Sequence, residues 1–111
     1  MKIEVRHVQN VAIIKPNGKI TIGIGDVLLR EAVVKCLDEG DRNILVSMGA
    51  VTNIDSSGIG ELVSAYKTVS NRGGKLKLCK LPSIVSDILM VTQLISVFEV
   101  SDSEQEAIDS F

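Results

Sequence analysis

The chain has 111 residues, of which 45% are hydrophobic and 23% are charged, and a formal net charge of -2. This composition is typical of a globular domain that buries a core without disulfides or a structural metal, so we expect residues 1–111 to form one domain. It argues against nucleic-acid binding, because affinity for the phosphate backbone depends on a surplus of clustered Lys and Arg.

The cysteines and the single histidine do not indicate a metal site. Cys36 and Cys79 are far apart in the sequence and form no CxxC pair, and His7 has no companion at the spacing of a metal ligand. We therefore expect two reduced thiols in the core. The N-terminus has no long apolar stretch, and polar residues interrupt the most apolar later segment, residues 84–98. These features predict a cytoplasmic protein that does not enter a membrane.

The first half of the chain predicts a hairpin, a helix and a buried strand. Residues 2–8 alternate loosely, and residues 11–14 are a largely β-branched apolar run, so the two segments predict strands joined by a short turn. From Asp26 the apolar residues recur at helical spacing, and Gly40 stands where the C-terminus of a helix prefers glycine. Residues 44–46 are wholly apolar, which predicts a strand buried on both faces.

The second half alternates helices with strands. Apolar residues repeat at helical spacing after two adjacent serines and stop at a pair of glycines, and the next segment, KLKLCK, alternates as a strand. A serine followed three residues later by a glutamate predicts the start of the last helix. The predicted elements are a helix from within residues 56–58 to residues 71–74, a strand at 75–80, a helix from Pro82 to Thr92, a strand at 97–100, and a terminal helix capped by Ser101 and Glu104 that buries Ala107, Ile108 and Phe111.

The predicted order of elements is therefore ββαβαβαβα. Strands that alternate with helices favour a sheet whose later strands are parallel, because right-handed crossovers join them, and the initial hairpin supplies an antiparallel strand. We predict an α/β fold with a mixed, mostly parallel sheet flanked by about four helices.

The stretch Asn53–Leu62, NIDSSGIGEL, is the candidate functional site, and enzymatic motifs do not match it. Ser56 and Ser57 lack the glycine two residues earlier that a nucleophile elbow requires, and the only histidine is far away in the sequence. No segment completes a phosphate-binding loop or a dinucleotide-binding motif. Asp55 and Glu61 are too few for a metal site. We therefore expect no catalytic residue and no metal ligand here.

The C-terminal acidic cluster has a structural explanation. Asp102, Glu104 and Glu106 would lie near the first turn of the last helix, where acidic side chains are favourable because of the helix dipole. We therefore expect these carboxylates to form a solvated charged face rather than a pair for acid and base chemistry.

The glycines of the candidate stretch leave the start of the second helix bare. A serine at a helix start is most often a simple N-cap, but Gly58 and Gly60 each cost about 1 kcal/mol relative to alanine inside a helix. A first turn without side chains opens its backbone N–H groups and a serine hydroxyl to close approach. That arrangement suits a phosphoacceptor, and a phosphate of about -1.5 to -2 charges would confront Asp55 without unfolding the helix.

Several segments together resemble one known family. They are the opening hairpin, GKIT before the first helix, IDSSGIGEL after a short apolar strand, GGKLKL, and VTQLISVFEV, which is similar to the T-G-L-x-x-x-F segment of that family. On these residues the chain resembles the STAS domain of the anti-sigma factor antagonist family over nearly its whole length. The resemblance implies the same α/β fold and a bacterial regulator of transcription rather than an enzyme.

The resemblance also implies partner switching. The unphosphorylated protein would bind a serine-kinase anti-sigma factor and thereby release a sigma factor. The kinase, using ATP, would phosphorylate Ser57, and a metal-dependent serine phosphatase would restore the hydroxyl. The chain itself would need no cofactor and would be a monomer or a weak homodimer. The residues that the resemblance places in the partner-binding loop are Thr21, Asn53, Asp55, Ser56, Gly58, Gly60 and Glu61.

Two alternatives stay open. Many family members carry acids where this chain has Thr21, after the second strand, and Ser47, at the end of the central strand. These departures, and an apolar content generous for so small a chain, favour a single-domain scaffold subunit of a stress-signalling assembly, which would form a larger oligomer. The third interpretation, an enzyme acting on a small molecule, has only the serine loop in its favour.

Overall fold

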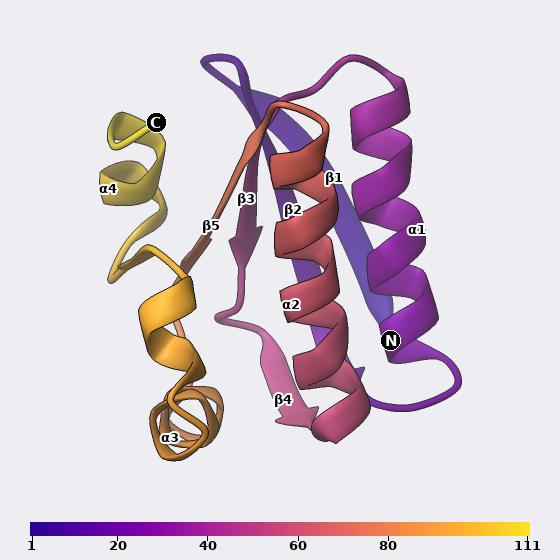
Figure 1. Cartoon of the computed structure of the whole chain (residues 1–111), viewed down its shortest axis with the longest axis vertical. Helices are drawn as coiled ribbons and strands as arrows, with labels where there is room; N and C mark the ends of the chain where they lie inside the picture. Colours follow the sequence, from indigo (N-terminus) through magenta and orange to yellow (C-terminus); the bar gives the residue numbers. More distant parts are fainter.

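A mixed six-stranded sheet forms the centre of the computed structural model, which describes residues 1–111 (Figure 1). The first two strands, β1 (Lys2–Val8) and β2 (Val11–Ile20), form the predicted antiparallel hairpin. Its turn is tight because Gln9 and Asn10 both adopt positive φ angles, 50° and 67°, as a type I′ turn requires. All other strand pairings are parallel, which confirms the predicted fold class.

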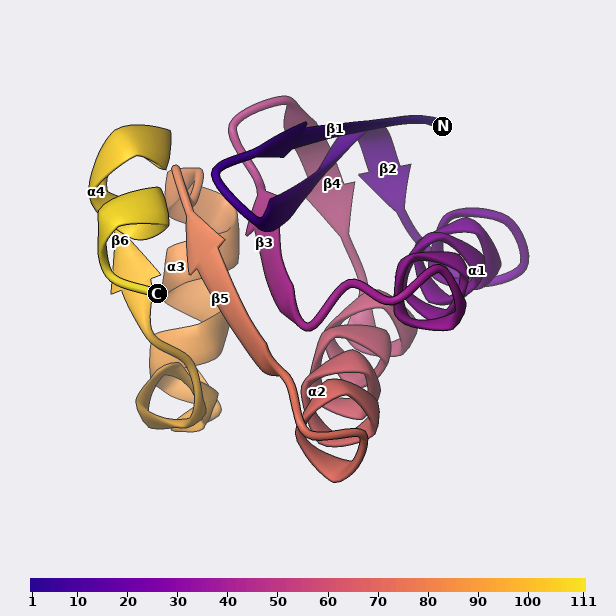
Figure 2. The same ribbon diagram turned by 90° about the horizontal axis from the view of Figure 1, so that it is seen from above.

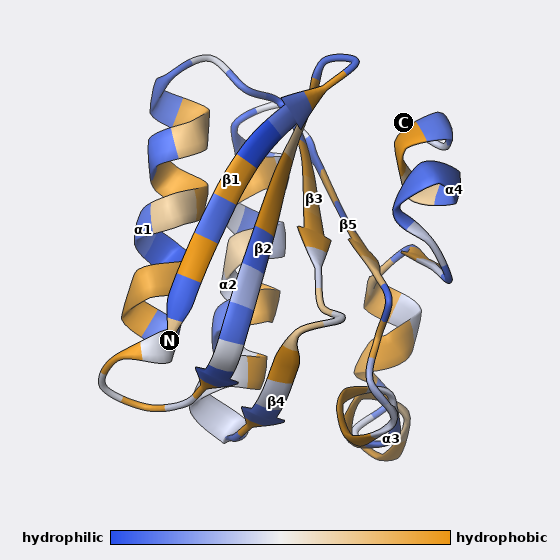
Figure 3. Ribbon diagram, turned by 180° about the vertical axis from the view of Figure 1, so that it is seen from behind, coloured by the Kyte–Doolittle hydropathy of each residue, from blue (hydrophilic) through white to orange (hydrophobic).

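β2 has two different parallel neighbours along its length. Its first four residues pair with β3 (Asn43–Ser47), and its last three pair with β4 (Val51–Ile54) (Figure 3). Pro16 lies between the two pairings, so its missing N–H removes no parallel ladder bond. The sequence prediction ended this strand at Ile14 and omitted β4. It did so because the turn-forming residues 15–18 interrupt the apolar pattern, and the middle of β4 is polar and exposed.

β5 (Lys75–Cys79) and β6 (Val100–Ser101) complete the sheet, which has the order β1-β2-β3-β5-β6 apart from β4. Between them the chain forms α3 (Ser83–Val91), as predicted, and a short 3-10 helix, η1 (Leu94–Val97), which was not predicted. Because η1 winds the chain up to Val97, the last strand begins later than the predicted strand at 97–100.

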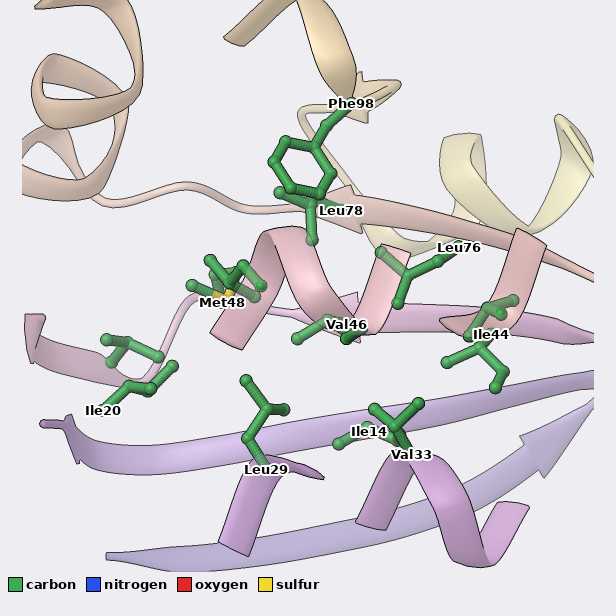
Figure 4. Close-up of a cluster of buried hydrophobic side chains, with 14 of the residues drawn as sticks. Ile14, Ile20, Leu29, Val33, Ile44, Val46, Met48, Leu76, Leu78 and Phe98 are labelled. Carbon is green, nitrogen blue, oxygen red and sulfur yellow. The ribbon is translucent and has the colours of Figure 1, made fainter. Parts of the chain in front are cut away.

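Two long helices cover one face of the sheet (Figure 2). α1 (Gly25–Asp38) and α2 (Ser56–Asn71) match the predicted helices, and each is followed by a glycine with a positive φ. Their inner side chains pack on those of the strands in the main core; Figure 4 shows Leu29 and Val33 of α1 beside Ile14 of β2. None of the helices in the structure combines the length and the apolar character needed to cross a membrane.

The last helix, α4 (Glu104–Asp109), covers part of the opposite face and lies next to β5 and β6 (Figure 2). Ala107 and Ile108 are buried there in a second, smaller cluster, as predicted, and Phe111 packs against this cluster while remaining partly exposed. The alternation of side chains along β2 and β3 therefore serves two cores, one under α1 and α2 and one under α4.

The cap of α4 differs from the predicted capping box. Ser103, not Ser101, is the N-cap, since its hydroxyl accepts a hydrogen bond from the backbone N–H of Glu106 at 3.1 Å. The helix therefore starts two residues later than the predicted cap requires, although the serine and the glutamate have the same spacing in both arrangements.

Glu104 is not the solvated charge that the sequence predicts. Its carboxylate accepts a hydrogen bond from the hydroxyl of Ser47 at 2.8 Å and forms an ion pair with Arg6. Burial raises the pKa of Glu104, but the hydrogen bond from Ser47 and the charge of Arg6 outweigh burial and leave the pKa below its ordinary value. Ser47 and Arg6 thus fasten α4 to β3 and β1.

Both cysteines are buried free thiols, as predicted. Burial, followed by the nearby charges of Asp41 and Glu39, raises the pKa of Cys36 to about 11. Burial also raises the pKa of Cys79. Neither thiol is activated for nucleophilic chemistry, because activation requires a lowered pKa and access to solvent.

Candidate functional site

The parallel pairing of β2 with β4 brings two distant segments to one edge of the sheet. Ile20 pairs with Ile54, so the loop that follows β2, Thr21–Ile24, lies beside Asp55 and the start of α2. Figure 3 shows the tips of β2 and β4 side by side, and Figure 1 shows the start of α2 at the same end of the molecule. The pairing therefore joins Thr21 to the candidate serine segment.

Asp55 connects this loop with α2. It is the N-cap of α2, with extended backbone angles, and one carboxylate oxygen accepts a hydrogen bond from the N–H of Gly58 at 2.9 Å. The other oxygen accepts a hydrogen bond from the N–H of Ile22 at 3.0 Å. These bonds from Ile22 and Gly58 hold the pKa of Asp55 below its ordinary value, since they favour the charged carboxylate. Neither serine is the N-cap of α2, because Asp55 has that role. Capping therefore does not explain why two serines follow Asp55.

Glu61 lies between the two long helices and not on the surface of the loop. Its side chain is only 5% exposed, and its Oε1 atom is 2.6 Å from Nη2 of Arg30 on α1. A second contact, at 2.8 Å, joins the same oxygen to Nε of Arg30. The sequence places Glu61 in a partner-binding loop, whereas in the structure its carboxylate is buried and joins α2 to α1.

Ser56 and Ser57 are the first two residues of α2. Ser56 is exposed and Ser57 is partly buried. Ser57 is four residues before Glu61, so both lie on the same side of the helix, the side that Glu61 directs toward α1. No other acidic side chain occupies the first turn of α2, so the positive end of the helix dipole is offset by Asp55 alone.

The two glycines of the motif have different roles. Gly58 is buried, and a Cβ atom there would lie 2.1 Å from the carbonyl oxygen of Ile20 and 2.7 Å from Cγ1 of Ile54. Its missing side chain is thus required for the packing of α2 on β2 and β4, which corrects the expectation that it clears space for a partner. Gly60 is exposed, and a Cβ there would have no neighbour within 4 Å, so this position does leave the helix surface open.

The two remaining predicted residues lie at the same edge of the sheet. Asn53 is exposed on β4 and pairs with Lys19 of β2. Thr21 is partly buried and directly follows β2. The structure therefore places Thr21, Asn53, Asp55 and the serines together and leaves an accessible surface around them.

Two isoleucines at this surface were not singled out from the sequence. Ile22 is 73% exposed and Ile24 is 67% exposed, and they project from the Thr21–Ile24 loop. Asp26 supports the same loop, because its Oδ1 atom accepts a hydrogen bond from the N–H of Gly23 at 3.0 Å. The sequence feature that could have identified them is ITIG, in which isoleucines directly precede a glycine-rich helix start. Exposed isoleucines in a supported loop provide an apolar contact surface beside Ser57.

The geometry provides no support for nucleophilic catalysis by the serines. His7 hydrogen-bonds to Asp41 at 2.9 Å and pairs with Ala12, near the start of β2, whereas the serines lie beyond the end of β2. No group of three or more His, Cys, Asp or Glu side chains is arranged to hold a metal ion. The arrangement is suited to recognition and modification: a hydroxyl at a helix start, a fixed carboxylate and an apolar loop.

Known proteins share this fold and sequence pattern. A family model, the STAS domain, matches residues 2–107. The anti-sigma F factor antagonist of Paenibacillus polymyxa is 23% identical over 108 residues, which cover 97% of this chain and 92% of that protein. The crystal structure of TM1081 from Thermotoga maritima has a TM-score of 0.89 and 27% identity, and the match covers 97% of this chain and 92% of that chain.

A more distant structural neighbour has been solved in two forms. The anti-sigma factor antagonist SpoIIAA in its unphosphorylated form has a TM-score of 0.75 and 17% identity, covering 98% of this chain and 96% of that chain. A structure of the Bacillus protein in the phosphorylated form has a TM-score of 0.74 and covers 98% of each chain. These two similarities concern the fold alone, whereas the family model matches nearly every residue of the sequence. The chain therefore belongs to the STAS domain family.

Proposed function

We propose that this protein is an anti-sigma factor antagonist of the cytoplasm that binds a serine-kinase anti-sigma factor and is switched off by phosphorylation of Ser57. The observation that carries the proposal is the position of Ser57 in the first turn of α2, beside a fixed carboxylate and the exposed Thr21–Ile24 loop. The relative from Paenibacillus polymyxa, which is named an anti-sigma F factor antagonist and is covered over 92% of its length, supports it.

In this proposal the protein is the substrate of its partner. The hydroxyl oxygen of Ser57 attacks the γ-phosphorus of ATP held by the kinase; a phosphate ester forms, the bond to the β-phosphate breaks, and ADP leaves. The hydroxyl proton passes to a base of the kinase or to water. A serine phosphatase later hydrolyses the ester and restores the hydroxyl.

The added charge explains how binding would end while the domain stays folded. A phosphate of about -2 charges is compatible with the positive end of the α2 dipole, so the helix remains stable. At a protein interface, however, the phosphate must lose its hydration and meet Asp55 and the partner surface. A loss of about 3 kcal/mol would lower the affinity by more than about a hundredfold.

The direct test maps the phosphate. The binding partner is isolated with the Ser57→Ala protein, purified, and incubated with the unmodified protein and ATP, and the product is mapped by mass spectrometry. We expect phosphate on Ser57, loss of labelling in Ser57→Ala and retained labelling in the matched Ser56→Ala control. Phosphate on Ser56 would move the acceptor by one residue, and no phosphate within residues 52–60 would refute the switch.

A second candidate function is a scaffold subunit of a larger signalling assembly. α3 favours it, because Ile84, Met90 and Val91 are 45%, 60% and 83% exposed, so the outer face of this helix carries large apolar side chains; much of the α3 ribbon is coloured as hydrophobic in Figure 3. Such a face is suited to contacts between subunits. Light scattering on the isolated protein separates the candidates: a defined large oligomer supports the scaffold, and a monomer whose kinase binding is lost in Ser57→Asp supports the switch.

A further inference from the structure

The carboxylates of Asp55 and Asp26 hold the Thr21–Ile24 loop, because they accept hydrogen bonds from two adjacent backbone N–H groups of the loop. The N–H of Ile22 donates to Oδ2 of Asp55 at 3.0 Å, and the N–H of Gly23 donates to Oδ1 of Asp26 at 3.0 Å. Asp26 also accepts the N–H of Val27 at 2.8 Å, so it belongs to the start of α1. The exposed loop is therefore anchored on one side by α1 and on the other by the cap of α2.

The anchor on the α2 side belongs to the same helix start as the proposed phosphoacceptor. Asp55 precedes Ser57 by two residues, in the same turn of the chain, and its other oxygen accepts the N–H of Gly58. Ser57 also lies on the α1-facing side of α2, the side on which the loop approaches. A phosphate on Ser57 would therefore be added close to the carboxylate that holds Ile22.

A phosphate on Ser57 and the carboxylate of Asp55 would compete for the same N–H groups at the start of α2. Both are anions, and both are stabilised by the N–H groups at the start of α2. A phosphate brings more charge and three acceptor oxygens, so it competes for those N–H groups and repels the carboxylate. The bond from Ile22 is the contact of Asp55 that lies outside the helix, so it can be lost without unwinding α2.

We propose that Asp55 is a positioning residue that transmits phosphorylation of Ser57 to the Thr21–Ile24 loop, by releasing the N–H of Ile22 when the phosphate displaces its carboxylate. This inference rests on the proposed function and deepens it. Phosphorylation then acts twice on a partner: it adds charge beside Ser57, and it frees the loop that presents Ile22 and Ile24.

The test needs no kinase. Phosphoserine is incorporated at position 57 during synthesis, and amide hydrogen exchange of Ile22 and Gly23 is measured by NMR with and without the phosphate. We expect exchange at Ile22 to accelerate by about tenfold or more, the effect of losing one hydrogen bond to a charged group. Exchange at Gly23 changes less, because its acceptor, Asp26, lies on α1.

Matched variants separate the role of Asp55 from a general loosening of the loop. Asp55→Asn keeps a side-chain acceptor but removes the negative charge, so the phosphate should accelerate exchange at Ile22 far less than in the unmodified background. Asp26→Asn weakens the neighbouring anchor and should leave the response of Ile22 to the phosphate intact. Resonance dispersion in the NMR spectra verifies that each variant is folded.

The outcomes distinguish this inference from the proposed function. If phosphoserine at position 57 abolishes kinase binding but leaves exchange at Ile22 unchanged, the switch stands and the transmission through Asp55 is refuted. If Asp55→Asn shows the full response, the phosphate reaches the loop by another route and the inference also fails. If Ile22 responds as expected but the kinase neither binds nor phosphorylates the protein, the coupling stands and the proposed function fails.

Discussion

The carboxylate of Asp55 accepts a hydrogen bond from the backbone N–H of Ile22 at 3.0 Å, although the two residues are 33 positions apart in the chain. The contact exists because β2 and β4 are parallel neighbours, so the segments that follow them leave the sheet at the same edge. It connects the most exposed apolar loop at the site with the helix that carries Ser57.

The protonation of Asp55 should be visible at Ile22. The hydrogen bonds from Ile22 and Gly58 lower the pKa of Asp55 in the folded protein below the value of about 3.9 expected for the unfolded chain. Their stabilising contribution is therefore present above about pH 3.9 and is lost as the pH falls through the lower pKa of the folded state. We expect the amide shifts of Ile22 and Gly58 to titrate together, with a shared midpoint below about 3.9 in an NMR titration.

The control for this titration is Asp55→Asn, in which neither amide should show the step. A midpoint at or above the ordinary value for aspartate would mean that the carboxylate is not held by these two N–H groups. Separate midpoints for Ile22 and Gly58 would mean that they respond to different carboxylates.

The two serines near the start of α4 provide a second test. Ser103→Ala removes the acceptor for the N–H of Glu106 and should lower the free energy of unfolding by about 0.5 to 2 kcal/mol, the usual effect of losing an N-cap. Ser101→Ala removes a side chain that caps nothing and should change it by less than about 0.5 kcal/mol. Urea denaturation measures both; a larger loss for Ser101→Ala would favour the capping box predicted from the sequence.

The parts of the fold that were predicted from the sequence are those with a strong local pattern. The hairpin, α1 and α2 each repeat their apolar residues at one period and end at turn-forming or glycine residues. β4 was missed because only its first and last residues are buried, so four residues show no clear alternation. Its pairing with β2 is a long-range contact, and no local pattern specifies it.

The same distinction applies to the site. Asp55 and Ser57 belong to one short motif and were recognised together, whereas Ile22 and Asp26 precede it by about thirty residues and join it only through the pairing of β2 with β4. The burial of Glu61 was not predicted, because its partner Arg30 belongs to a different helix. Local sequence therefore indicated the proposed phosphoacceptor, and tertiary contacts determined which side chains surround it.

The two glycines of the motif should respond in opposite directions to the same substitution. Gly58→Ala places a Cβ 2.1 Å from the carbonyl oxygen of Ile20, and that strand backbone cannot move without disturbing β4. We expect a net loss of about 1 to 3 kcal/mol in the free energy of unfolding, since overpacking outweighs the better helix propensity of alanine. Gly60→Ala meets no neighbour within 4 Å and should stabilise the domain by up to about 1 kcal/mol.

Combining this pair with kinase binding separates packing from recognition. Because Gly60 lies on the open surface of α2, Gly60→Ala should weaken partner binding while the domain becomes more stable. Gly58→Ala should lower the free energy of unfolding. At temperatures where this variant remains folded, its affinity for the kinase should change only if the added Cβ displaces the start of α2. Urea denaturation and titration calorimetry measure the two effects. Equal stability of the two variants would show that α2 does not pack closely on Ile20, and tight kinase binding by Gly60→Ala would place the interface away from this face of the helix.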